Sequence, residues 1–184
     1  MFGLCCHDQL LLHKRIAKKL WKVNKLRLEF WALLLKEIKG KSTIFQNSNP
    51  TKDHWLVAGG TDIAGASFQF IITYTNAAVH LNFGRPTTSE NKLLFDSLAT
   101  YKAQIEEKFG TELNWERMDD KKSSRVSFTK AGLNYFKKED WPQIISFLIE
   151  NINLLEAAVR PYLGTIKTAL ITIDAGVDEE VLEN

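Results

Sequence analysis

The chain has 184 residues, of which 45% are hydrophobic and 25% are charged, and its formal net charge is +2. These proportions are typical of a globular protein, and the length fits one domain with extensions. No run of about 18 apolar residues occurs and the N-terminus lacks a secretory cleavage pattern, so the sequence predicts a cytoplasmic protein without a membrane span. The two cysteines, Cys5 and Cys6, are adjacent, which argues against a disulfide framework and a cysteine-based zinc site.

The charge is unevenly distributed along the chain. Residues 1–41 carry ten Lys or Arg against three acids, a local net charge of +7, whereas the last eleven residues carry five acids and no base. A basic head can contact nucleic acid, and an acidic end can keep a protein in solution. The alternative is that both ends are ordinary solvated termini.

The first predicted elements are two helical segments. Residues 13–23 place apolar side chains at helical spacing with lysines between them, which predicts a basic amphipathic helix. This helix can continue into a second one over residues 26–39, which ends at Gly40. The buried side of the second segment is predicted to carry Phe30, Leu33, Leu34 and Ile38.

Residues 41–65 form a long connection rich in Ser, Asn, Pro and Gly, interrupted by a short strand near residues 55–58. Loops of this length are often functional. Asp53, His54 and Asp62 lie in it and form a His/Asp cluster. With Ser48, Thr51 or Ser67 it could form a hydrolase triad, and a small metal-dependent hydrolase using the cluster is a further alternative. No GxSxG motif supports a hydrolase, and ordinary loop structure is the alternative.

Two hairpins and a helix follow. Apolar residues alternate with polar ones over residues 66–83, which predicts a first hairpin, and residues 113–128 predict a second one around an Asp-Asp-Lys-Lys turn. Between them, Thr87 and Glu90 have capping-box spacing at the start of a helix that ends at Gly110.

The last predicted helix begins near Asp140, which can cap it, with Pro142 in its first turn. Pro161 is predicted to end this helix, because proline cannot continue the backbone hydrogen bonds. The predicted fold is therefore α+β with two layers: a four-stranded, mainly antiparallel sheet of two β-hairpins packed on three long helices. Residues 1–25 form a basic extension, residues 26–163 a single α+β domain, and residues 164–184 a tail that ends acidic.

One face of the predicted sheet is polar. If the aromatic and aliphatic strand residues face the helices, the opposite face carries Ser67, Gln69, Thr73, His80, Asn82, Glu116 and Arg125, with Arg85 at its edge. Such side chains suit contacts with phosphates and base edges, although an ordinary solvated face is the alternative. The candidate nucleic-acid-binding residues are Lys14, Arg15, Lys18, Lys19, His80, Arg85 and Arg125.

No complete catalytic motif is present. Gly60 and Gly65 have the spacing of a phosphate-binding loop, but the lysine that must follow is absent. Two Glu-x-Lys matches, at Glu37 and Glu106, fall on predicted helices, whereas nucleases place this motif on a strand. The sequence therefore predicts no catalytic residue, no metal ligand beyond the loop cluster and no cofactor.

Several short segments together resemble a bacterial and archaeal family: Leu28–Trp31, Lys52–Trp55, Ala58–Gly60, Gly65, Asn91–Asp96, Ile105–Glu106, Phe109–Gly110, Leu113–Asp119 and Asp140–Trp141. The family is domain of unknown function 4268, and the resemblance covers about residues 26–163. Its members often form the C-terminal half of proteins whose N-terminal half looks like a restriction endonuclease. The resemblance therefore implies a DNA restriction or defence context, with a nuclease domain or subunit as partner. Residues 1–25 are too short to be that nuclease, so its activity is not implied for this chain.

The expected function is a non-catalytic recognition domain that binds nucleic acid, with DNA as the partner. One alternative is a protein-interaction or dimerisation module in which the N-terminal helix packs on a partner, such as a second copy in a homodimer. A second alternative is a small metal-dependent hydrolase or nuclease.

Overall fold

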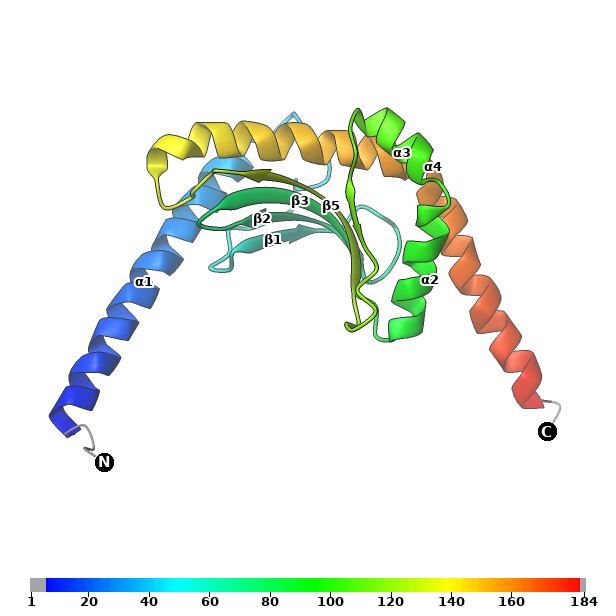
Figure 1. Cartoon of the computed structure of the whole chain (residues 1–184), viewed down its shortest axis with the longest axis horizontal. Coiled ribbons are helices and arrows are strands. Elements are labelled where there is room, and N and C mark those ends of the chain that lie inside the picture. Colours follow the sequence, from blue (N-terminus) through cyan, green and yellow to red (C-terminus); the bar gives the residue numbers. More distant parts are fainter. Residues whose placement is uncertain (1–5, 183–184) are drawn as a thin grey trace.

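The computed structural model describes the backbone of residues 6–182 and the side chains of residues 14–170. Within these ranges the fold is α+β, with one antiparallel sheet of five strands and four α-helices (Figure 1). The helices are α1 (Cys6–Glu37), α2 (Thr88–Ala99), α3 (Lys102–Phe109) and α4 (Trp141–Leu182). The strands are β1 (Trp55–Ala58), β2 (Ala66–Ile72), β3 (Asn76–Phe83), β4 (Asn114–Glu116) and β5 (Ser124–Ala131).

The strands lie in the order β1-β2-β3-β5-β4, and every neighbouring pair is antiparallel. Both predicted hairpins are present, as β2–β3 and β4–β5, and β3 pairs with β5 to join them. The predicted sheet had four strands. The fifth is β1, the short strand in the long connection, which pairs with β2 through Trp55 to Ala58.

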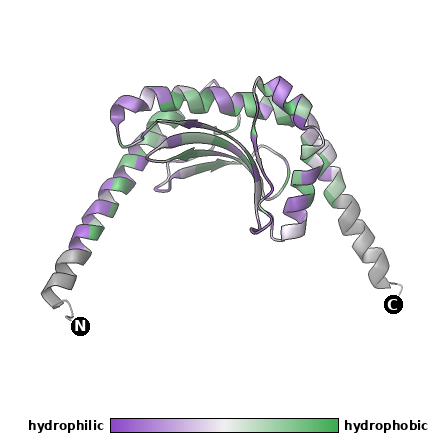
Figure 2. Cartoon of the chain, in the orientation of Figure 1, coloured by the Kyte–Doolittle hydropathy of each residue, from purple (hydrophilic) through white to green (hydrophobic). Residues whose placement is uncertain are grey.

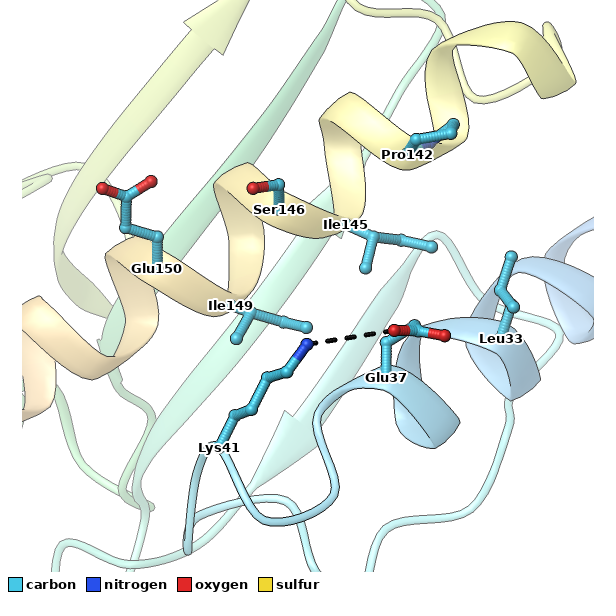
Figure 3. Close-up of a pocket in the computed structure, with 8 residues that line it drawn as sticks. All are labelled: Leu33, Glu37, Lys41, Pro142, Ile145, Ser146, Ile149 and Glu150. Carbon is cyan, nitrogen blue, oxygen red and sulfur yellow. Dashed lines mark ion pairs between the residues drawn. The ribbon is translucent and has the colours of Figure 1, made fainter.

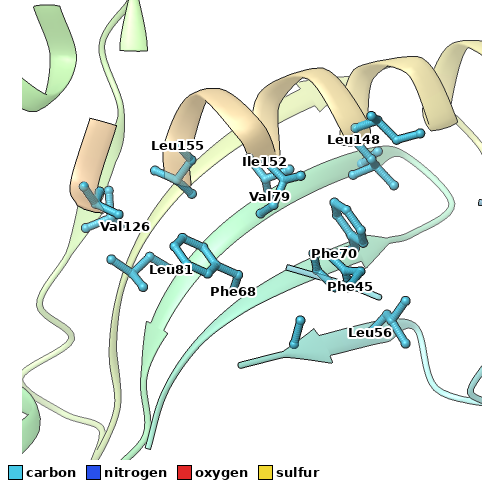
Figure 4. Packing of buried hydrophobic residues seen from close by; sticks show 14 of the residues in the cluster. Phe45, Leu56, Phe68, Phe70, Val79, Leu81, Val126, Leu148, Ile152 and Leu155 are labelled. Atoms are coloured by element: carbon cyan, nitrogen blue, oxygen red, sulfur yellow. The ribbon is translucent and has the colours of Figure 1, made fainter. Parts of the chain in front are cut away.

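The core lies between the sheet and α4, which crosses one face of it (Figures 1 and 4). Aromatic and aliphatic residues of β2 and β3 alternate with polar ones, so they share the face that meets the helix. The side chains that meet there are fully buried, and each contributes about 2 kcal/mol through loss of apolar surface. They include Phe68, Phe70, Val79, Leu81, Leu148, Ile152 and Leu155.

The two predicted N-terminal helices form one continuous helix, α1. No Gly or Pro interrupts residues 13–39, so nothing in the sequence forces a break. Near its C-terminal end α1 buries Phe30, Trp31 and Leu34, whereas the other end extends away from the sheet (Figure 1). Leu33 was predicted to lie on the buried side, but it is exposed, because it faces outward beside α4.

The helix predicted after residue 87 is split. The capping box is present, since Glu90 N donates to Thr87 Oγ1 and Thr87 N donates to Glu90 Oε2. The helix nevertheless ends at Ala99 and α3 begins at Lys102, with the Tyr101 ring stacked on Tyr162 of α4. Gly110 ends α3 in the left-handed conformation with φ 97°, as predicted.

The prediction that Pro161 ends the last helix is wrong, because α4 continues through it to Leu182. Residues on the far side of this proline, Leu163 and Ile166, are buried, so packing outweighs the lost backbone hydrogen bond. Asp140 also does not cap α4; its carboxylate accepts a hydrogen bond from Asn134 N instead (3.0 Å). The predicted tail is helical as far as Leu182, and its acidic side chains lie outside the described side chains.

The free ends of α1 and α4 diverge to opposite sides of the molecule, with the curved sheet between them (Figure 1). The helices that pack on the sheet lie on the face that carries Phe68 and Phe70. Among the described helices, none is both long and apolar enough to cross a membrane.

Candidate nucleic-acid interface

The polar face of the sheet is built from two neighbouring rows of cross-strand partners. One row contains Gln69, His80 and Ser127, because β3 residue His80 pairs with both others. The next row contains Ser67, Asn82, Arg125 and Glu116. Since side chains alternate along a strand, both rows point away from the core residues Phe68 and Leu81. Thr73 is not on this face; it lies in the β2–β3 turn, where its hydroxyl donates to Asn76.

Arg125 and Glu116 are paired with each other across β5 and β4. Arg125 Nη2 donates to Glu116 Oε1 at 2.9 Å, and its Nε donates to Oε2 at 2.5 Å. This hydrogen bond is the main reason that the pKa of Glu116 is lowered. The two charges cancel locally, so Arg125 does not offer an uncompensated positive charge to a phosphate.

His80 lies in the middle of the face and is only 9% exposed. Burial, with a smaller contribution from the neighbouring Arg125, lowers the pKa of His80 from 6.5 to about 4. The imidazole is therefore neutral at pH 7. It can donate and accept hydrogen bonds, but it does not attract phosphate as a cation.

Arg85, at the edge of the sheet, holds two segments of the chain together through its side chain. Its guanidinium forms an ion pair with Glu90 at 2.6 Å and also donates to Ala64 O at 2.8 Å. Hydrogen bonds from Thr87 and Arg85 lower the pKa of Glu90 to about 2. Gly65 permits this contact, because a Cβ there would lie 2.7 Å from Arg85 Cγ. Arg85 thus ties the loop before β2 to the start of α2.

Six basic residues of α1, unlike Arg85 and Arg125, are exposed and form no ion pair with a described residue. Lys14, Arg15, Lys18 and Lys19 are all exposed, as are Lys22 and Lys25 further along the helix. None of the six forms an ion pair within the described part of the chain. At about 100° per residue, four of them share one side of the helix. We call these four the basic face of α1: Lys14, Lys18, Lys22 and Lys25.

The loop cluster is not assembled. Asp53 and His54 precede β1 and Asp62 follows it, so a strand about 13 Å long separates them. Asp53 accepts a hydrogen bond from Thr51, and the His54 ring packs edge-on against Trp55. Burial and the nearby Arg27 lower the pKa of His54. Among residues with described side chains, no three His, Cys, Asp or Glu are close enough to hold a metal ion.

A groove between α1 and α4 was not predicted from the sequence (Figure 3). Its volume is about 440 Å³, and the ion pair between Glu37 and Lys41 (3.9 Å) lies on one side of it. Its apolar wall comes from Leu33, Pro142, Ile145 and Ile149. Residues more than 100 positions apart form it, so no local pattern could have indicated it.

Lys92 of α2 is a second feature that the sequence did not reveal. Although buried, its ammonium donates to the carbonyls of Met118, Lys121 and Ser123 at 2.8, 2.9 and 2.9 Å. Burial is the main reason that its pKa is lowered. This lysine holds the β4–β5 turn on α2 and is structural, because backbone carbonyls surround its charge.

Comparison with known proteins gives a single result. No curated protein and no solved structure matches this chain. The model of one family, described as a domain of unknown function (DUF4268), matches residues 26–163. The matched region begins within α1 and ends within α4, and it includes the whole sheet. The basic face of α1 lies before it. This match covers most of the sequence, and the chain belongs to the DUF4268 family.

Proposed function

We propose that this protein is a non-catalytic nucleic-acid-binding domain whose phosphate contacts are made by the basic face of α1. One observation carries the proposal: four exposed lysines lie on one side of a helix that extends from the domain, without an ion pair to any described residue. Arg15 and Lys19 flank them and are equally exposed.

The other side of the same helix is apolar, and the two sides can be followed in Figure 2. Ile16 and Leu20 continue the stripe that buries Phe30 and Leu34 near the sheet. Because the basic face points away from this stripe, it can approach a phosphate backbone without disturbing the core. Cations at helical spacing bind phosphates and release counterions, which favours binding without sequence preference.

The candidate cations on the sheet are not suited to bind phosphate, although the sequence predicted that they would contact nucleic acid. Arg85 and Arg125 are each paired with a glutamate, and His80 is neutral at pH 7. We therefore assign the phosphate contacts to α1. A DNA restriction or defence context, implied by the family resemblance, provides a setting in which DNA is the partner.

The test is a binding titration with the full chain and a fluorescent oligonucleotide at about 50 and 200 mM salt. The quadruple variant of Lys14, Lys18, Lys22 and Lys25 to Glu is expected to bind at least on the order of 100-fold more weakly, because it removes the cations that release counterions. Binding by the wild type should weaken steeply as salt rises.

A matched control changes four exposed lysines elsewhere to Glu: Lys108, Lys121, Lys137 and Lys167. The net charge change is the same, so a loss specific to α1 separates a local contact from a general charge effect. Equal losses in both variants, or binding by the wild type that does not respond to salt, would contradict the proposal.

A second candidate, a dimerisation module, is favoured by one observation. Ile16 and Leu20 lie on the core-facing side of α1 yet remain 56% and 57% exposed, because the helix has passed the edge of the sheet. The partner proposed for this apolar stripe is a second copy of the chain. Residues 14–25 carry six Lys or Arg and no acid, and residues 174–184 carry five acids and no base, so the two ends are complementary in charge.

A further inference from the structure

The polar face of the sheet contains a buried side chain that lacks a partner. His80 is 9% exposed, and no described residue forms a hydrogen bond with its ring nitrogens. No described side-chain atom is both fully buried and without a hydrogen bond, so the ring nitrogens of His80 retain a small exposure. The sheet register directs this exposure to the face opposite the core. A ligand on that face could therefore satisfy His80.

Amide groups surround this imidazole. Gln69 is the direct cross-strand neighbour of His80, and its Nε2 donates to Ser67 Oγ, which leaves its carbonyl oxygen available. Asn82 follows two residues after His80 on the same face and forms no side-chain hydrogen bond with a described residue. Donors and acceptors thus lie side by side, about 7 Å apart along a strand.

The charge on this face is balanced. Arg125 and Glu116 bind each other, and no unpaired carboxylate or cation lies in the two rows around His80. A phosphate or another ion would gain little here. The face instead suits a neutral, planar group with hydrogen-bonding edges.

An exposed aromatic ring lies on the same face. Trp55 of β1 pairs with Ile71, which pairs with Ala78, so these three form an apolar row beside the row of Gln69 and His80. Trp55 is 39% exposed although it lies in a strand. An indole beside amide and imidazole groups is what an unstacked nucleobase requires, because it needs both a stacking surface and partners for its edge.

The start of β1 is tied directly to α1. Arg27 Nη1 donates to Lys52 O at 3.0 Å, and Trp31 Nε1 donates to Asp53 O at 3.0 Å. Trp55 follows this segment by two residues, so the apolar row begins next to the helix that carries the basic face. The segment before β1 thus joins the apolar row to the end of α1 that packs on the sheet.

We propose that the polar face of the sheet binds unpaired bases of a single-stranded nucleic acid: Trp55 stacks on one base, and Gln69, His80 and Asn82 hydrogen-bond to base edges. The inference rests on the proposed function, because the basic face of α1 supplies the phosphate contacts. The inference adds that the ligand is a single-stranded nucleic acid. Bases in a duplex are stacked and paired, so they cannot lie flat on a sheet, and the single strand is the preferred form.

The test compares a labelled single strand of about 12 nucleotides with a duplex of the same sequence, since sheet-based sites cover a few to about 16 nucleotides. The wild type is expected to bind the single strand about tenfold more tightly than the duplex. Trp55→Ala should weaken single-strand binding by about 5- to 100-fold, the range for loss of one stacked base, and leave duplex binding unchanged.

Two further variants test whether the effect comes from the aromatic ring at position 55. Trp55→Phe retains a stacking ring and should bind the single strand within about threefold of the wild type. Tyr74→Ala removes a more exposed aromatic ring, which stacks on Phe136 away from this face, and should have no effect on binding. Circular dichroism of each variant checks that it is folded.

The outcomes separate the two proposals. If the wild type binds and the four lysines of α1 matter, but Trp55→Ala has no effect and the duplex binds equally well, the base-binding face is wrong and the proposed function remains. If neither oligonucleotide binds, both proposals are wrong.

Discussion

At the scale of single residues, the charge that a side chain presents depends on its nearest partner. Arg85 and Arg125 differ from the lysines of α1 because each has a glutamate within hydrogen-bonding distance. Glu90 is close in sequence to Arg85, but Glu116 reaches Arg125 only through the pairing of β4 with β5. The burial of His80 likewise requires neighbours on β2 and β5. A polar residue on a strand can thus be assigned to a face from its sequence, whereas its charge state depends on the assembled sheet.

His80 makes stability depend on pH in a defined direction. Its pKa is about 4 in the folded protein and 6.5 in the reference state, so between these values the unfolded chain binds the proton more readily. The stability that neutral His80 contributes is therefore fully present above pH 6.5. As the pH falls towards 4 this contribution is lost, and the free energy of unfolding decreases by up to about 3 kcal/mol in total. Urea denaturation from pH 7.5 down to pH 4 should show this loss.

The variant His80→Gln cannot be protonated and should have a shallower decline in unfolding free energy over the same pH range. His54→Gln serves as the control, because His54 is exposed and its burial penalty is smaller. An unchanged slope in His80→Gln would contradict the assignment.

At the scale of elements, packing decided where helices begin and end. Local signals placed the capping box and the Gly110 stop correctly, because both act within one helical turn. The Pro161 prediction failed because distant contacts outweigh the local signal: α4 packs against α2 and α3, and its residues before and after the proline, such as Val159 and Leu163, are buried. A short strand was predicted at β1, but its place as the fifth strand of the sheet depends on its pairing with β2.

Lys92 links two elements and provides a test of this kind of packing. Lys92→Met keeps most of the side-chain volume but leaves the carbonyls of the β4–β5 turn without their donor. We expect the free energy of unfolding to fall by about 3 kcal/mol, because several buried acceptors lose their partner at once. Urea denaturation monitored by tryptophan fluorescence measures the change.

Lys108→Met on the exposed side of α3 is the matched control, and it should change stability by less than about 0.5 kcal/mol. A similar small effect at Lys92 would mean that water replaces the ammonium without cost.

At the scale of the whole molecule, the sequence is basic towards the N-terminus and acidic towards the C-terminus, and the described ends of α1 and α4 lie on opposite sides of the sheet (Figure 1). The backbones of α1 and α4 diverge towards these two ends (Figure 1). Pairing of these ends would therefore occur between two copies. A twofold arrangement would form the contact twice and close the assembly.

Light scattering of the full chain tests this arrangement. A dimer is expected at twice the chain mass of 21.0 kDa, and the double variant Ile16→Ser, Leu20→Ser should return to the mass of a single chain, because it removes the apolar stripe. Leu154→Ser, at an exposed leucine of α4, is the control and should leave the dimer intact. A wild type that remains a single chain at high protein concentration and low salt would exclude this mode of association.

The sequence by itself determined the α+β class, both hairpins, the polar face of the sheet, the basic α1 and the family, because periodicity, caps and short motifs depend on residues close together in the chain. The tertiary structure decided the rest: the pairing of β3 with β5, the continuation of α4 through Pro161, the groove between α1 and α4, and the neutral state of His80. Each of these depends on contacts between distant segments, whose free energies outweigh local preference. The same contacts separate Asp53 and His54 from Asp62. They also pair Arg85 and Arg125 with glutamates, so of the candidate cations predicted on the helix and on the sheet, the proposal keeps only those of α1.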